Sequence, residues 1–142
     1  RWAMDWYYPV LTGVLEGVAA ARRMAERWGA FVAPGLGARC VSDRFWVTAA
    51  ETAECAMAAG RAGLAEEAER LLAWTSHFRD RDGAYWTGCA HPECVRFPGG
   101  QRSTYSAAAV VIADHVLHRG SPAASIFGAG APRLVPAPAG LV

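Results

Sequence analysis

Helical segments of two kinds alternate along the chain, and this alternation restricts the possible folds more than any other feature. Residues 6–20, 45–59 and 104–117 are apolar almost all round and carry few charges. Residues 21–28 and 64–78 are amphipathic, with apolar side chains recurring at helical spacing along one face. Helices of the first kind need burial on most sides, whereas helices of the second kind keep one face in water. The sequence therefore predicts two layers of helices.

The apolar segments also look like repeats of one unit. Each begins with an aromatic-rich stretch (WYYP, RFWVT or STYS) and continues into alanine and valine. Such recurrence is typical of repeated helical hairpins. We therefore expect an all-α fold with an inner layer of buried helices and an outer layer of amphipathic ones. No segment shows a convincing period of two, and residues 87–102, which contain Pro92, Pro98, Gly99 and Gly100, are expected to form a loop.

These patterns divide the chain into two parts. Residues 1–118 are predicted to form the helical-hairpin domain, and residues 119–142, rich in alanine, proline and glycine, an irregular tail. The chain starts with Arg1 rather than Met, and its first residues are already dense in aromatic side chains. We therefore expect it to be part of a longer protein.

Composition excludes several classes of protein. The 142 residues are 53% hydrophobic and 19% charged, which is enough for one domain with a core and disfavours disorder. The net charge is +1 without a cluster of basic residues, so no nucleic-acid partner is expected. There is no charge-free apolar run of about 18 residues, so no transmembrane helix is expected. Four cysteines do not require a disulfide framework, which favours a cytoplasmic location.

Glu51 and Glu54 are the first candidates for chemistry, because they lie on one stripe of the otherwise apolar segment 45–59. Two carboxylates on a mostly buried helix need water, cationic partners or a cavity. One interpretation pairs them structurally with Arg39 or Arg44. The other places one of them in a central cavity as an acid or base.

Two further regions combine acids with aromatic rings. Asp5 precedes three consecutive aromatic residues that could stack on a sugar, shield a carbocation or simply fill the core. Asp82 begins a predicted turn followed by Tyr85 and Trp86. The candidate catalytic residues are Asp5, Glu51 and Asp82. The candidate substrate-binding residues are Trp6, Tyr7, Tyr8, Asp43, Arg44, Trp46, Glu54, Tyr85 and Trp86.

Cys89, His91 and Cys94 place three possible metal ligands within six residues. A structural zinc site needs four ligands, and no fourth lies nearby in the sequence. We therefore read this stretch as a surface loop with incidental thiols and predict no metal and no other cofactor.

Four stretches resemble a known group of proteins: RWAMDWYYPVLTG, RCVSDRFWVTAAETAE, DGAYWTG and FPGGQRSTYSAAAVVIADHVL. They are similar to the C-terminal portion of actinobacterial prenyltransferase-like proteins of the terpenoid cyclase/protein prenyltransferase superfamily, over roughly residues 1–117. The resemblance implies an (α/α)6 toroid and a transferase acting on an isoprenoid. Closing the toroid would need missing N-terminal hairpins or another chain. The acidic D-x-D-D motif of the cyclases is absent.

Two alternatives stay open. Six-hairpin glycosidases use the same toroid and place two carboxylates across a cleft lined with Trp and Tyr, so a sugar substrate would suit Glu51 with Asp5 or Asp82. A non-catalytic helical scaffold is the third possibility. A dry, aromatic cavity would favour an isoprenoid substrate, and an open cleft with two carboxylates about 5–9.5 Å apart would favour a glycoside. Acids all paired with arginine, without a cavity, would favour the scaffold.

Overall fold

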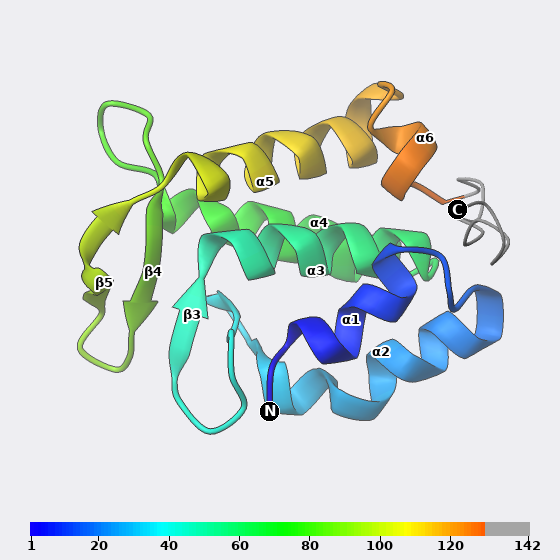
Figure 1. Cartoon of the computed structure of the whole chain (residues 1–142), viewed down its shortest axis with the longest axis horizontal. Helices are drawn as coiled ribbons and strands as arrows, with labels where there is room; N and C mark the ends of the chain where they lie inside the picture. Colours follow the sequence, from blue (N-terminus) through cyan, green and yellow to red (C-terminus); the bar gives the residue numbers. More distant parts are fainter. Residues whose placement is uncertain (130–142) are drawn as a thin grey trace, which may run out of the picture.

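The computed structural model describes residues 1–129 and contains helices and two small sheets (Figure 1). The α-helices are α1 (Met4–Leu11), α2 (Gly17–Phe31), α3 (Ala49–Arg61), α4 (Ala65–Trp74), α5 (Thr104–Asp114) and the short α6 (Ala124–Phe127). The strands are β1 (Val32–Ala33), β2 (Gly37–Ala38), β3 (Trp46–Thr48), β4 (Trp86–Ala90) and β5 (Val95–Arg102). A 3-10 helix (Thr75–Phe78) follows α4, and a π-helical turn (His115–Arg119) follows α5.

Helix α3 is the centre of the molecule. It contacts α1, α4 and α5 and lies among them in Figure 1. It is rich in alanine, whose short side chain lets neighbouring helices pack closely, and nearly all of its residues are buried. By contrast, α4 turns Glu66, Glu69 and Arg70 to the solvent. Helix α2 likewise keeps one face exposed and packs against α1.

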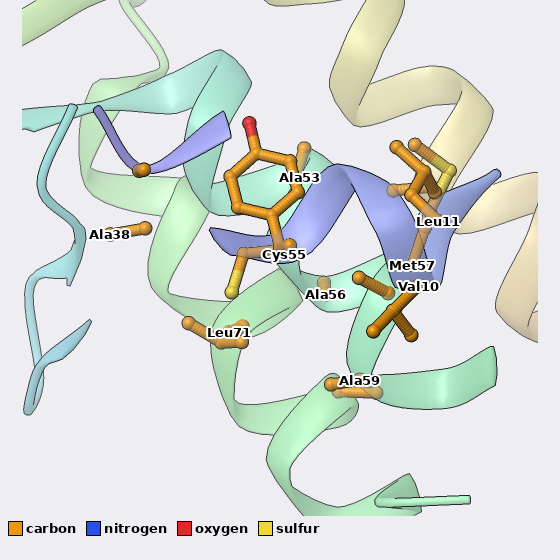
Figure 2. Close-up of a cluster of buried hydrophobic side chains, with 14 of the residues drawn as sticks. Val10, Leu11, Ala38, Ala53, Cys55, Ala56, Met57, Ala59 and Leu71 are labelled. Atoms are coloured by element: carbon orange, nitrogen blue, oxygen red, sulfur yellow. The ribbon is translucent and has the colours of Figure 1, made fainter. Parts of the chain in front are cut away.

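The core lies between α3 and the elements around it. Figure 2 shows side chains of α1, α3, α4 and β2 meeting there. The labelled residues are Val10, Leu11, Ala38, Ala53, Cys55, Ala56, Met57, Ala59 and Leu71, all of which are buried. Ala109, Val110 and Ala113 of α5 belong to the same core, so α1 and α5 both pack against α3.

The sheets overturn the prediction of an all-α fold. Strands β1 and β2 form a small antiparallel pair, and β3, β4 and β5 form a three-stranded antiparallel sheet in that order. Residues 87–102 are therefore most of a β-hairpin rather than a loop. Pro98, Gly99 and Gly100, which suggested a loop, lie in β5 at the edge of the sheet, where such residues are tolerated. The architecture is mixed α/β.

Two of the helices predicted from the sequence, residues 45–59 and 6–20, have different ends in the structure. Residues 46–48 form strand β3 and α3 starts only at Ala49; the aromatic and β-branched residues of that stretch favour a strand. Segment 6–20 is interrupted after Leu11, because Gly13 has a φ of +75° and turns the chain. A Cβ at Gly13 would lie 2.2 Å from Nη2 of Arg61, so a side chain there would have to displace the end of that arginine and would be strained by the positive φ as well.

The C-terminal region is described only in part. Helix α6 packs against the π-helical turn and α3, and Phe127 contacts the main core. The remainder of the predicted tail, residues 130–142, lies outside the described residues, so the proposed boundary at 118 stays a prediction. No helix within residues 1–129 is both long enough and apolar enough to cross a bilayer.

Candidate active site

Glu54 is held between two tyrosines from different helices. It lies on α3 and is only 8% exposed. Tyr7 of α1 donates its hydroxyl to Oε2 of Glu54 at 2.5 Å, and Tyr105 of α5 donates to Oε1. Each of the three packed helices therefore contributes one side chain to this cluster. The two donors offset the cost of burying the carboxylate and fix its orientation.

The phenols around Glu54 are held in their protonated form. Burial raises the pKa of Tyr7 far above its usual range, and the neighbouring Glu54 charge raises it further. The pKa values of Tyr105 and Tyr8 are raised for the same two reasons. The three hydroxyl groups therefore remain hydrogen-bond donors over the whole physiological pH range.

Glu51 lies one turn before Glu54, in the first turn of α3. It is half-buried and accepts a hydrogen bond of 2.5 Å from Oγ1 of Thr48, the last residue of β3. Burial raises its pKa, and the Glu54 charge adds to this effect while the Thr48 hydrogen bond opposes it. Burial also raises the pKa of the nearby Cys40 thiol to about 11, with a further contribution from the Glu51 charge. Glu51 therefore takes up a proton more readily than an ordinary glutamate.

Neither glutamate has a cationic partner among residues 1–129. The ion pairs of this region involve other acids. Arg39, one of the two partners expected from the sequence, instead lies over the ring of Phe45 at 4.3 Å from its centroid. Arg44 is exposed. The structure therefore does not support a structural ion pair, the first of the two sequence interpretations.

A cavity of about 310 Å³ opens beside Glu54, between α1, α3, α5 and α6. Its polar end consists of Glu54, Tyr8 and Tyr105, and the remaining wall is largely apolar. That wall is formed by Leu11, Thr12, Met57, Ala108, Ala109, Ile112 and Phe127. The volume is in the range of small-molecule sites, and so is the combination of apolar walls with a few converging polar groups.

Asp5 borders a groove that adjoins this cavity. Tyr8 and Thr12 line both the cavity and the groove, and Asp5 lines the groove together with Met4, Pro9 and Val14. The Asp5 side chain is exposed, and its backbone oxygen accepts a 2.8 Å hydrogen bond from Arg23. Among the predicted catalytic residues, Asp5 therefore adjoins the cavity through Tyr8 and Thr12, whereas Glu51 lies one turn from Glu54 on α3 and does not line the cavity.

Asp82 has different surroundings. It lies in the exposed turn before β4 and accepts a 2.6 Å hydrogen bond from Nη1 of Arg102. The backbone N–H of Ala84 and this guanidinium lower its pKa. Arg102 also lies over the ring of Trp86, 5.5 Å from its centroid. Asp82, Tyr85 and Trp86 therefore belong to the β4–β5 hairpin and its preceding turn rather than to the cavity.

The other predicted binding residues are spread over the molecule. Trp6 is fully buried, stacks on Phe31 and donates Nε1 to the backbone oxygen of Arg23, so it belongs to the core. Trp46 stacks on Phe97 within the three-stranded sheet. Asp43 forms an exposed ion pair of 3.4 Å with Arg1. Of the binding residues predicted from sequence, Tyr7, Tyr8 and Glu54 are the ones brought together.

Tyr105 was missed by the sequence analysis, although a signal existed. It lies in STYS, the third of the aromatic-rich starts, at a position comparable to Tyr7 and Tyr8 in WYYP. The apolar wall from Ala108, Ile112 and Phe127 was not foreseeable, because nothing local distinguishes these residues from ordinary core positions. Cys89, His91 and Cys94, the three possible metal ligands noted in the sequence, gather at the β4–β5 turn.

Comparison with known proteins finds similarity to a protein named as a mannosidase. No protein-family profile matches the chain. The chain is 46% identical over 134 residues to a protein of Mycolicibacterium hassiacum named MMP endo-(1,4)-3-O-methyl-alpha-D-mannosidase. The alignment covers 94% of this chain and 37% of that relative, so the chain spans little more than a third of the relative's length. The predicted prenyltransferase-like family was therefore wrong, as was its all-α toroid.

Proposed function

We propose that this chain is part of a glycoside hydrolase that cleaves α-mannosidic bonds. The observation that carries the proposal is the Glu51–Glu54 pair on α3, which has no cationic partner in the described residues and of which Glu54 lines a cavity of small-molecule size, with Glu51 one helical turn away. The similarity to a protein named a mannosidase supports the same class of reaction. An isoprenoid substrate has no comparable support, and the unpaired acids argue against a mere scaffold.

Glycosidases need one carboxyl group that is protonated at working pH and a second that is ionised. Glu51 fits the first role, because burial and the adjacent Glu54 charge raise its pKa. It would donate a proton to the oxygen of the leaving sugar. Glu54 fits the second role, since the hydroxyls of Tyr7 and Tyr105 orient its two oxygens. Asp5, across the adjoining groove, is the other candidate for the second carboxylate.

The wall of the cavity supports an O-methylated sugar as the substrate. Leu11, Met57, Ile112 and Phe127 offer an apolar surface, while the hydroxyls of Tyr8 and Tyr105 stand beside Glu54 at the polar end. A sugar with a methyl ether can place its methyl group on that surface and its free hydroxyls at the polar end. An unmodified mannoside would bury polar hydroxyls against the same surface without partners, which is unfavourable.

Hydrolysis of an α-1,4-linked oligosaccharide of 3-O-methylmannose by the intact protein tests the proposal. Glu51→Gln is expected to lower kcat/KM by about 10²–10⁴-fold, the usual contribution of a general acid, without loss of folded protein. The matched control is Glu66→Gln, an exposed glutamate on α4 that should leave the rate unchanged. Full activity of Glu51→Gln, or no hydrolysis by the native protein, would overturn the proposal.

A second pair of variants identifies the other carboxylate. Glu54→Gln keeps the shape of the side chain but removes its charge, and Asp5→Asn does the same at the edge of the groove. The variant that loses activity to the same extent as Glu51→Gln marks the partner. If Asp5→Asn does so while Glu54→Gln keeps its activity, the assignment of Glu54 is wrong and the catalytic centre extends along the groove.

A further inference from the structure

The turn of the β4–β5 hairpin collects three side chains that bind metal ions. Cys89 lies in β4, His91 and Cys94 lie in the turn of residues 91–94, and Arg96 lies in β5. Cys89 pairs with Arg96 across the hairpin, and the turn between the two strands brings His91 and Cys94 beside Cys89. The hairpin, which the sequence analysis missed, thus creates the cluster.

The three groups are already close together. One ligand atom from each of Cys89, His91 and Cys94 lies within 4.8 Å of the other two. In a tetrahedral zinc site, bonds of about 2.3 Å to sulfur and about 2.0–2.1 Å to nitrogen put the ligand atoms roughly 3.4–3.8 Å apart. The widest separation therefore has to shrink by only about 1 Å, which side-chain rotation can provide.

Two local features fit a ligand at this place. Cys94 has a φ of 54°, a left-handed conformation that residues other than glycine rarely adopt and that is often kept for a functional reason. Nε2 of His91 is buried and has no hydrogen-bond partner among the described residues. A bond to a metal ion would satisfy this nitrogen, which is otherwise costly to bury.

We propose that Cys89, His91 and Cys94 bind one Zn²⁺ ion, with the fourth position open to water. Two thiolates and an imidazole are the ligands that zinc prefers over harder cations. Cys94 is exposed, so the ion can enter from the solvent and keep a water molecule. Nη1 of Arg96 donates to Sγ of Cys89 at 3.0 Å and would serve as an outer partner of the zinc-bound thiolate. This site is independent of the proposed mannosidase activity.

Metal titration of the reduced, chelator-treated protein tests this proposal without any enzyme assay. Co²⁺ serves as a spectroscopic probe, because thiolate coordination gives it a sulfur-to-metal charge-transfer absorption, and Zn²⁺ should displace it with a stoichiometry of one per chain. Cys94→Ser changes an exposed residue and should preserve the fold. It is expected to weaken zinc binding by more than the about 10–100-fold that follows the loss of an outer partner.

The matched control is Cys40→Ser, which removes a half-buried cysteine outside the cluster and should leave the titration unchanged. The melting temperature supplies a second measurement: zinc should raise it in the native protein and in Cys40→Ser, but not in Cys94→Ser. A cobalt spectrum without thiolate bands, or unchanged binding by Cys94→Ser, would overturn the proposal.

Discussion

Acidic side chains beside aromatic rings occur in two regions of this molecule, with opposite surroundings. On α3, Glu54 lines the cavity between two tyrosines and Glu51 lies one turn before it; neither pairs with a cation among residues 1–129, and burial raises the pKa of Glu51. At the β4–β5 hairpin, Asp82 is exposed and pairs with Arg102, so its pKa is lowered. The same pattern in the sequence therefore gives a carboxyl group ready to exchange protons in one region and a solvated ion pair in the other.

The difference arises from which elements surround each acid. Glu54 is enclosed by α1 and α5, whose tyrosines donate hydrogen bonds but bring no positive charge. Asp82 lies in a turn at the surface, where water and a long arginine side chain reach it easily. Burial without a counter-charge is costly and is tolerated where function requires it, whereas an exposed ion pair contributes little to stability.

The largest expected change in stability comes from Tyr7→Phe. Removing this buried hydroxyl leaves Oε2 of Glu54 without its donor, and the free energy of unfolding should fall by about 1–3 kcal/mol. Urea denaturation at neutral pH measures it. A loss below about 0.5 kcal/mol would mean that water replaces the donor, and the contrast between the two regions would then be weaker than the structure indicates.

Tyr105→Phe sharpens the same comparison within the cavity. Tyr105 donates to the other oxygen of Glu54 but is 57% exposed, so water can replace its hydroxyl. The free energy of unfolding should fall by about 0.5–1.5 kcal/mol, less than for Tyr7→Phe. The reverse order in urea denaturation would show that the solvent-facing bond matters more than the buried one.

Glu51→Gln should have a small effect of the opposite sign that depends on pH. Because the pKa of Glu51 is raised in the folded protein, ionisation of this group at neutral pH opposes folding, and the amide removes that cost. The variant should therefore be more stable than the native protein near pH 7. The gain should disappear as the pH falls through the raised pKa toward the ordinary value of 4.5. Thermal melts of Glu51→Gln and the native protein at several pH values check this. A difference in melting temperature that does not change with pH, or that favours the native protein near pH 7, would contradict the burial of Glu51.

Asp82→Asn should cause the smallest change. The group is fully exposed and its pair with Arg102 is screened by solvent, so neither the melting temperature nor the activity should change measurably. Melting curves in low and high salt, compared with those of the native protein, check this. A clear loss of activity would move the catalytic centre to the hairpin and end the contrast between the two regions.

Local pattern predicted part of the site. Because Glu51 and Glu54 share one stripe of an apolar helix, the sequence indicated that these carboxylates need water, a cationic partner or a cavity. It also identified Tyr7 and Tyr8 as candidate binding residues. The strands were not predicted, since β5 combines an edge position with Pro98, Gly99 and Gly100, and β3 is too short to show a period of two. The all-α fold was wrong because residues 87–102 were taken for a loop and residues 46–48 for part of a helix. The family inferred from resemblance was wrong as well, as the similarity to a protein named as a mannosidase shows.

The amino-acid sequence alone determined which segments are helical and apolar enough to be buried, because periodicity and side-chain chemistry are local properties. Only the tertiary structure decided that Tyr105 reaches Glu54, that Asp82 is paired with Arg102, and that Cys89, His91 and Cys94 converge. These are contacts between residues that the sequence separates or that depend on the register of a hairpin. Their energies depend on burial and on neighbouring charges, which exist only once the helices and strands have packed.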